Sequence, residues 1–475
     1  MKFIYIDLIF LALFVIFVSA FLYIKRKNVQ VESKIFLIYR TKVGIKIIKK
    51  LSKILPLTFL SDIAIFCGYL MMFTSIFLLY KVFEMMISSV ILVNIPPVIP
   101  LIPYLPEIFK LTFLPPFYFT YWIISILIIA VSHEFSHGIF ANFYKINLKS
   151  TGFGFLGPFL AAFVEVDEKA NNKAIDKKKY KSQLAILSGG PFANLVMTVL
   201  FLLLMNGFFS LAYAPSGINY IYAANNISLS SIDRMNEINV IPSQIISALN
   251  KFNDTNASIR FSANGTKYIL TLEILQTQKK IINISQQLFV YYDSPAYRSN
   301  LSGPIIKIQN EKIDSIEALN KTLSKLQPSQ KINVETLEKN YSITLDSDPT
   351  NSSKPFLGVS FYTLKESLLS KFLKVFIEGR KDSFVYYAPK LDSIWGNIII
   401  FIYNLLFWII MINLSVALFN MLPLSVFDGG KFFQITMLKL TNDKKKAMKL
   451  FRIVSGLIGG FIALITAIWF VRWIF

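Results

Sequence analysis

The stretch FTYWIISILIIAVSHEFSHGIFANF, residues 119–143, is an apolar run that contains one polar pentapeptide, HEFSH at 133–137. About 20 consecutive apolar residues are enough for a helix to cross a bilayer. Ionisable side chains inside such a span are costly and by default indicate a functional site, although two histidines there can also be a hydrogen-bonded structural pair. We predict that residues 119–143 form a transmembrane helix that carries a site.

The spacing within the pentapeptide is that of a metal-binding motif. Residues four apart lie on one face of a helix, so His133 and His137 can reach the same ion while Glu134 lies beside them. The chain contains no other histidine, so a chance pairing at this spacing would be rare. We predict that His133 and His137 bind Zn²⁺ and that Glu134 is the catalytic base that activates a water molecule.

Catalytic zinc takes three protein ligands, and two histidines leave one position open. The only cysteine, Cys67, lies in another apolar run, so we expect a carboxylate at the edge of a span. Asp428 is the first candidate, because Pro423 ends a helix before it and two glycines after it allow a tight backbone. A helix-capping role for Asp428 and ligation by Glu165 are the alternatives.

The other apolar runs predict an α-helical polytopic membrane protein. The chain of 475 residues is 54% hydrophobic and 16% charged, whereas an average soluble domain is about 25% charged. About six transmembrane helices are expected, at residues 3–24, 62–80 with an extension toward Val93, 119–143, 182–213, 396–423 and 451–473. The prolines of residues 95–116 predict a loop, and the Gly-rich apolar stretch at 151–166 predicts strand.

The charge distribution predicts an orientation. The formal net charge is +21, and its basic residues gather at 25–56, 167–181 and 441–452, which six spans place on one side. That side is expected to be the cytoplasm, with the N-terminus outside. Basic residues follow the run at 3–24, which favours a transmembrane helix over a signal peptide. No nucleic-acid-binding motif accompanies the charge, so the expected partner is the lipid bilayer.

A polar insert, residues 216–375, is expected outside the cytoplasm. Nine Asn-X-Ser/Thr triplets fall within 216–353, where chance would give about three. These asparagines predict a glycoprotein. Residues 294–346 resemble a PDZ domain, with a short helix near 315–326, and residues 227–273 are interpreted as a degraded second copy with a helix near 242–251. A generic small α+β fold is the alternative.

Four motifs in order resemble the site-2 protease family of intramembrane zinc metalloproteases. They are HEFSH at 133–137, GFGFLG at 152–157, SGGPFAN at 188–194 and NMLP at 420–423 before Asp428-Gly429. The resemblance covers residues 119–213 and 396–440, and Phe427 stands where the family usually has Leu. It implies cleavage of transmembrane protein substrates near the cytoplasmic face of the cell membrane.

The resemblance also implies substrate-binding residues. Asn420 and Asn194 would lie near the substrate backbone, although hydrogen bonding between helices would equally explain both. Gly154 and Phe155, in the Gly-rich strand, are expected to bind an extended substrate segment by strand addition.

Four parts of the chain follow from these expectations. They are N-terminal helices with a basic loop (1–118), the first part of the catalytic core (119–215), the insert (216–375) and the second part of the core with a last helix (376–475). A proteolytically inactive zinc-binding protein and a cation transporter are the alternative functions. Glu134 argues against the first, and the absence of paired repeats of broken helices argues against the second.

Overall fold

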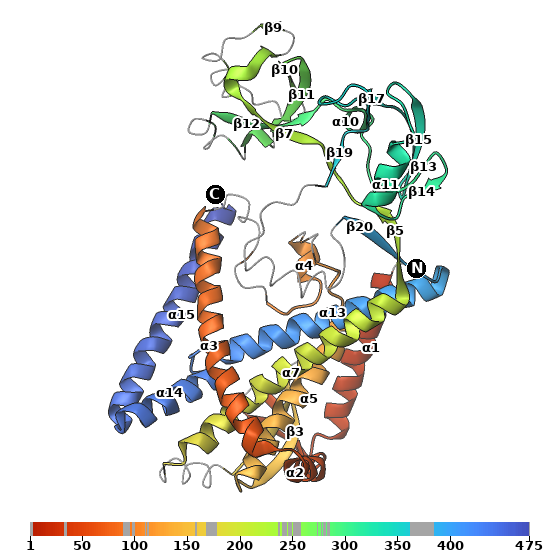
Figure 1. Ribbon diagram of the computed structural model, residues 1–475. Coiled ribbons are helices and arrows are strands. Elements are labelled where there is room, and N and C mark those ends of the chain that lie inside the picture. The colour runs from red at the N-terminus through yellow and green to blue at the C-terminus, as the bar shows by residue number, and fades with distance from the viewer. Residues whose placement is uncertain are drawn as a thin grey trace. The chain divides into compact units, whose positions relative to one another are not determined.

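The chain forms two compact units (Figure 1). Unit 1 comprises residues 1–208 and 398–475, and unit 2 comprises residues 209–397. The computed structural model describes residues 3–32, 36–88, 96, 100–109, 111, 114–156, 159–167, 178–235, 238–239, 245, 249, 258–272, 274–276, 278, 282, 286–361 and 384–474. The expected insert, 216–375, falls within unit 2.

Six helices of the described chain are long and apolar enough to cross a membrane, which confirms the predicted polytopic architecture. They are α1 (Phe3–Ile24), α3 (Leu57–Ser88), α5 (Phe119–Phe143), α7 (Tyr180–Ala212), α13 (Ser393–Asn420) and α15 (Lys444–Ile474). The span expected at 62–80, with an extension toward Val93, is α3, which begins five residues earlier, at Leu57, and continues through Lys81 and Glu84 to Ser88. Large apolar side chains such as Phe17 and Leu457 are exposed, as expected of helices that face lipid.

A four-stranded antiparallel sheet belongs to unit 1. Its order is β1 (Val29–Glu32), β2 (Phe36–Thr41), β3 (Leu148–Leu156) and β4 (Phe159–Val166). The predicted strand at 151–166 is therefore a hairpin. The basic segment 25–56, expected to be a loop, instead contains β1, β2 and the helix α2 (Ile45–Ile54). That expectation was wrong because β2 is stabilised by pairing with β3, a partner more than 100 residues away.

A buried carboxylate of α1 closes the N-terminus of α5. Asp7 is 1% exposed, and it accepts hydrogen bonds from the backbone N–H groups of Phe119 (2.8 Å) and Thr120 (2.9 Å). The hydroxyls of Thr120 and Tyr104 also donate to it. Tyr118, at the N-cap position, makes no side-chain cap bond. Asp7 therefore supplies from another helix the acceptor that a capping side chain usually provides.

The helix α14 (Asp428–Thr441), which the sequence reading missed, lies between α13 and α15. Its first turn approaches the preceding turn so closely that only glycine fits. A Cβ on Gly429 would lie 2.3 Å from the backbone carbon of Met421, and one on Gly430 would lie 2.1 Å from the carbonyl oxygen of Leu424. These two contacts hold the chain so that Asp428 begins the helix.

Unit 2 contains two six-stranded sheets. The first has the order β7-β12-β11-β10-β8-β9, and the second has β16-β15-β13-β5-β20 with β14 paired to β13. Each has an apolar core of its own, around Leu270 and Leu288 in the first and around Ile305 and Val334 in the second. The strands of the first sheet are β7 (Ala224–Ser228), β8 (Ile232–Met235), β9 (Ile238–Asn239), β10 (Ser258–Ala263), β11 (Thr266–Thr271) and β12 (Gln287–Tyr292).

Four strands of the second sheet and its helix lie in the block expected at 294–346, whereas β5 and β20 come from outside that block. The sheet and its helix comprise β5 (Tyr213–Ile218), β13 (Ile305–Ile308), β14 (Glu311–Lys312), β15 (Lys331–Thr336), β16 (Asn340–Thr344), β20 (Val385–Pro389) and α11 (Ile316–Leu323). The helix predicted near 315–326 is confirmed as α11. The helix expected near 242–251 falls almost wholly outside the described residues. The similarity to PDZ domains stays a prediction.

Unit 2 also has short elements outside the two sheets. They are β6 (Ile221–Tyr222), the 3₁₀ helix η2 (Leu229–Ser231), α10 (Pro295–Arg298), β17 (Asp346–Ser347), β18 (Pro355–Phe356) and β19 (Val359–Ser360). Two-residue ladders join β17 to β18 and β19 to β6. Unit 1 also has the one-turn helix α4 (Leu105–Ile108), which leads toward α5.

Asp7→Ala should destabilise the protein, because it leaves buried N–H and hydroxyl donors of the α5 N-terminus without an acceptor. We expect the free energy of unfolding to fall by about 1–3 kcal/mol in denaturant titrations of the detergent-solubilised protein. The matched control is Asp62→Ala, which removes an exposed ion pair with Lys181 and should cost less than about 1 kcal/mol. Equal losses in the two variants would contradict the capping role.

Candidate metal centre

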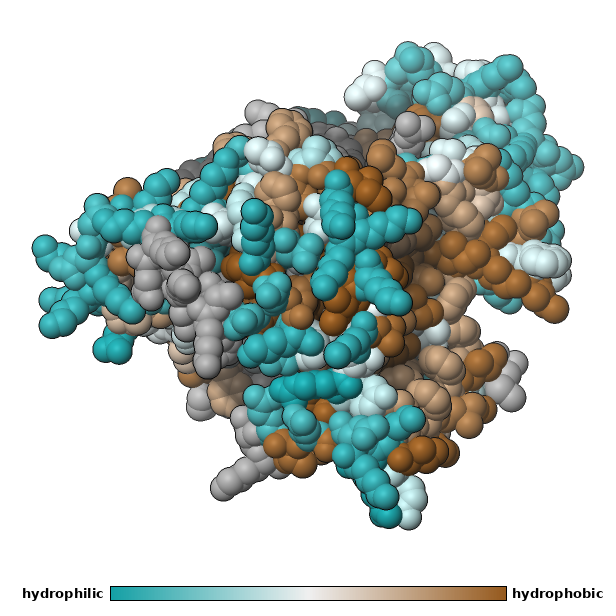
Figure 2. Space-filling model, turned by 90° about the horizontal axis from the view of Figure 1, so that it is seen from below, coloured by the Kyte–Doolittle hydropathy of each residue, from teal (hydrophilic) through white to brown (hydrophobic). Residues whose placement is uncertain are grey.

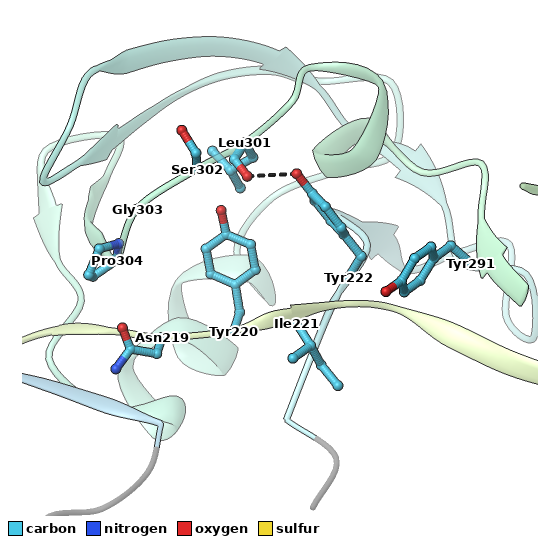
Figure 3. Close-up of a pocket in the computed structure, with 9 residues that line it drawn as sticks. All are labelled: Asn219, Tyr220, Ile221, Tyr222, Tyr291, Leu301, Ser302, Gly303 and Pro304. Atoms are coloured by element: carbon cyan, nitrogen blue, oxygen red, sulfur yellow. Dashed lines mark hydrogen bonds between the residues drawn. The ribbon is translucent and has the colours of Figure 1, made fainter. Parts of the chain in front are cut away.

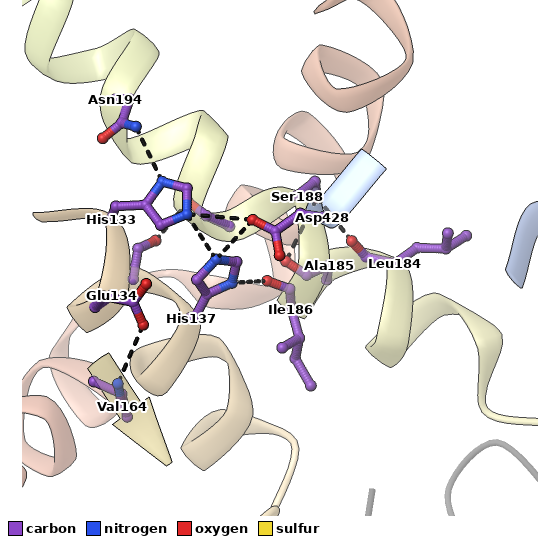
Figure 4. Close-up of polar contacts among 12 residues, drawn as sticks. His133, Glu134, His137, Val164, Leu184, Ala185, Ile186, Ser188, Asn194 and Asp428 are labelled. Atoms are coloured by element: carbon purple, nitrogen blue, oxygen red, sulfur yellow. Dashed lines mark hydrogen bonds and ion pairs between the residues drawn. The ribbon is translucent and has the colours of Figure 1, made fainter. Parts of the chain in front are cut away.

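Three ligand atoms from two distant parts of the chain meet beside α5 (Figure 4). His133 Nε2 and His137 Nε2 lie 3.0 Å apart, and each lies 3.2 Å from Oδ2 of Asp428. All three residues could hold one metal ion. The His133 residue is 7% exposed, and the side chain of Asp428 is 26% exposed. The centre is therefore enclosed by the helices but not sealed.

The donor set fits zinc. Zinc bound at about 2.0–2.1 Å by tetrahedral ligands would place those ligand atoms about 3.3 Å from one another, close to the separations observed. Two imidazoles and one carboxylate are also a ligand set found in catalytic zinc sites, which keep a fourth position for water. Asp428 thus lies where a carboxylate could complete the pair of histidines.

The outer nitrogens of both imidazoles are held by α7. Nδ1 of His137 lies 2.7 Å from the carbonyl oxygen of Ile186, which can only accept, so Nδ1 carries the proton and Nε2 keeps a free lone pair. Nδ1 of His133 lies 3.0 Å from Nδ2 of the fully buried Asn194. The Oδ1 atom of that amide is buried and has no hydrogen-bond partner among the described residues. Turning the amide over would let Oδ1 accept the Nδ1 proton, as metal-bound histidines require.

Glu134 is connected to the sheet. Its Oε2 accepts a hydrogen bond of 3.1 Å from the backbone N–H of Val164 in β4 (Figure 4). Along β3 and β4 the residues pair regularly from Thr151↔Val164 to Leu156↔Phe159. The Val164 N–H therefore points away from β3, and no further strand pairs with β4 in the part of the chain that is described. The open edge of the sheet thus faces the proposed base.

Two observations bear on the alternatives to ligation by Asp428. Phe427, not Asp428, occupies the N-cap position of α14, and no side chain makes a cap bond there. Glu165 accepts hydrogen bonds from Ser150 (2.6 Å) and Arg40 (3.1 Å) and is not part of the metal group. The hydrogen bond from Ser150 and the Arg40 guanidinium hold the pKa of Glu165 below its usual value.

The expected substrate-binding residues fall at different places. Asn194 contacts His133, whereas Asn420 is the half-buried last residue of α13, before the turn that leads to Asp428. Gly154 and Phe155 lie in β3, whose two sides are paired with β2 and β4. Their roles in substrate binding stay predictions.

A glycine of α7 that the sequence reading did not single out is part of the centre. A Cβ on Gly190 would lie 2.3 Å from Nε2 of His137 and 2.6 Å from Nε2 of His133. Beside it, the hydroxyl of Ser136 donates to the carbonyl oxygen of Gly189 at 2.7 Å. The Gly-Gly pair in SGGPFAN was the available signal, because it marks a helix that another group approaches closely.

Unit 2 has a separate hollow of about 380 Å³ (Figure 3). Tyr220, Tyr222 and Tyr291 line it together with the turn at 301–304. The Tyr222 hydroxyl donates to the carbonyl oxygen of Leu301 at 2.8 Å. The hydroxyl oxygen of Tyr220 is buried and has no hydrogen-bond partner in the described part of the chain. Burial raises the pKa of Tyr220, so its hydroxyl is neutral and can hydrogen-bond a neutral group.

Comparison with known proteins finds a match to a peptidase family and similarity to one other protein. A family model described as peptidase family M50 matches residues 121–465, a range that includes both histidines and Asp428. The chain is also similar to an uncharacterized protein of Methanocaldococcus jannaschii, with 34% identity over 174 residues. That alignment covers 36% of this chain and 43% of the other protein, so the chain matches less than half of that relative's length.

Gly190→Ala should disrupt the metal centre, since its methyl group would occupy the space of both Nε2 atoms. We expect metal affinity to fall about tenfold or more, measured by competition with a chelator on the purified protein. Gly207→Ala, on the same helix, is the matched control, because a Cβ at Gly207 would meet no atom within 4 Å. Unchanged affinity in Gly190→Ala would show that the imidazoles lie elsewhere in the native protein.

Proposed function

Since the chain belongs to peptidase family M50, the site-2 protease family that its motifs resemble, we propose that it is a zinc metalloprotease of the membrane. Its substrates are membrane proteins, cut in or near a transmembrane segment. One observation carries the proposal: two imidazoles and a distant carboxylate converge beside a glutamate on a helix apolar enough to span the bilayer. The retained Glu134 favours hydrolysis over zinc storage or cation transport.

Three residues would bind the metal ion, and a fourth would transfer protons. His133, His137 and Asp428 would hold Zn²⁺, which when bound lowers the pKa of a water molecule and polarises the scissile carbonyl. Glu134 takes a proton from the attacking water and delivers it to the leaving amide nitrogen. The water oxygen bonds to the carbonyl carbon as its proton is taken, and the C–N bond breaks afterwards, when the nitrogen receives that proton. Asn194 and Ile186 keep the two imidazoles oriented during these steps.

The open edge of β4 is where an extended substrate would pair. A helical substrate must first unwind, because its backbone groups are already hydrogen-bonded within the helix. Backbone groups of alternate residues in a strand point the same way, so Leu160 and Ala162 share the direction of Val164. A substrate carbonyl that accepts the Val164 N–H would replace Glu134 there and leave the glutamate available to water. Gly154 and Phe155 would act through the neighbouring strand.

The remaining assignments are parts of the same proposal. The basic segments support an orientation in which the sheet and the metal centre would lie toward the cytoplasm, and residues 216–375 would lie outside it. There, unit 2 would select substrates by their outer segments, and the tyrosine-lined hollow offers neutral polar and aromatic contacts for such a segment. Asn420, beside the turn that carries Asp428, would contact the substrate backbone.

Glu134→Gln should abolish cleavage and keep the metal, because the amide cannot take the water proton while the three ligands remain. We expect the cleavage rate to fall about 10²–10⁴-fold. The measurement compares membrane-protein fragments in native membranes with wild type or variant, together with zinc content of the purified proteins. Equal fragment patterns, or loss of zinc in this variant, would contradict the assigned role.

Proline substitutions can separate the two edges of β4. Ala162→Pro removes an N–H at the open edge, where proline is tolerated, and should abolish cleavage with zinc and stability kept. Ala161→Pro removes an N–H that pairs with β3 and should also lower the free energy of unfolding by about 1–3 kcal/mol. Wild-type cleavage by Ala162→Pro, with zinc retained, would exclude strand addition at this edge.

A further inference from the structure

The helix α2 packs against the part of α5 that carries the two histidines. Ile48 is fully buried, and a Cβ on Gly138 would lie 3.2 Å from its Cδ1 atom. The amide of Asn142 donates to the hydroxyl of Ser52 at 2.6 Å. At the start of α2, Gly44 has a φ of 89°, and a Cβ there would lie 2.7 Å from the Phe135 ring. One face of α2 is thus fixed against the segment that carries both histidines.

A second face of α2 carries only lysines. At about 100° per residue, four lysines fall within a sector of about 100° on the helix. All four are exposed, and none forms an ion pair within the described part of the chain. They are Lys46, Lys49, Lys50 and Lys53. These four residues form the lysine face, whose positive charge has no acidic partner among the described residues.

A third face of α2 is apolar and exposed. Ile47 and Ile54 are 55% and 65% exposed, and residues seven apart lie on the same side of a helix. Their sector lies between the lysine face and the face that packs on α5. The end of unit 1 seen from below likewise carries hydrophilic side chains interspersed with hydrophobic ones (Figure 2). A helix with this arrangement, placed just before the span α3, has the composition of an interfacial helix.

We propose that α2 lies in the membrane interface and binds the headgroups of anionic phospholipids. The lysine face would meet lipid phosphates, while Ile47 and Ile54 enter the boundary of the acyl chains. Lipid bound there holds α2 against Phe135 and Gly138, and so steadies the turn that carries the metal ligands. The inference needs only that α1 and α3 span the bilayer, and it holds whether or not the protein is a protease.

Hydrogen exchange on the whole protein in vesicles tests this binding. Amides 46–54 are compared in vesicles of phosphatidylcholine alone and in vesicles that also contain phosphatidylglycerol. We expect exchange to slow about tenfold with the anionic lipid, and amides 133–142 to change in the same direction. Salt at about 1 M, which shortens the screening length to about 3 Å, should remove the difference.

Two variants separate specific binding from net charge. Replacing the four lysines of α2 by glutamine should abolish the effect of phosphatidylglycerol. The control replaces four exposed lysines of α15 by glutamine and so has the same net charge as the α2 variant; they are Lys444, Lys445, Lys446 and Lys449. This control should preserve the effect of phosphatidylglycerol. Ile47→Ser with Ile54→Ser should speed exchange in both kinds of vesicle. Equal exchange of wild-type amides in the two vesicles, or a lipid effect that survives in the α2 lysine variant, would overturn the proposal.

Discussion

The close approach of His133, His137 and Asp428 is the constraint on which the rest of unit 1 depends. Three polar groups within 3.2 Å of one another are costly in an apolar span unless a metal and hydrogen bonds compensate for lost water. The fold meets the requirement with small residues at each crossing. Gly190 gives the imidazoles room on α7, and Gly429 lets the turn before α14 close on itself. Gly190 and Gly429, which belong to two of the motifs, are therefore explained by lack of space for a side chain.

A second requirement is that backbone groups at membrane depth find partners. Where α5 begins, Asp7 of α1 accepts from its first N–H groups. Where β4 has no strand neighbour, Glu134 accepts from Val164. Irregular backbone is tolerated at this depth only when protein covers it. The breaks in regular structure that the site needs are thus each closed by a side chain from another element.

The sequence predicted what periodicity and local chemistry determine. The span predicted at 119–143 has the observed bounds of α5. The four-residue spacing of His133 and His137 predicted that their side chains lie on one face of that helix. Asp428 could be predicted because few carboxylates lie at the edge of a span. The helix α14 was missed because it is short and amphipathic, between two longer apolar runs. The strands β1 and β2 depend on a distant partner, and the contact of Asn194 with His133 depends on how α7 crosses α5. No local pattern encodes either.

The arrangement around α5 links three tasks to one helix turn. Its HEFSH segment would supply two ligands and the base, contacts β4 through Glu134, and packs near the start of α2 through Phe135. Because one N–H of Val164 donates to the glutamate, the proposed substrate strand on β4 and a free base would be geometrically coupled. Any shift of α2 would move the same turn through Gly138, where Ile48 and Val164 both lie within 3.3 Å of the added Cβ position. Gly138, which has no side chain, allows β4, α2 and α5 to meet at one point.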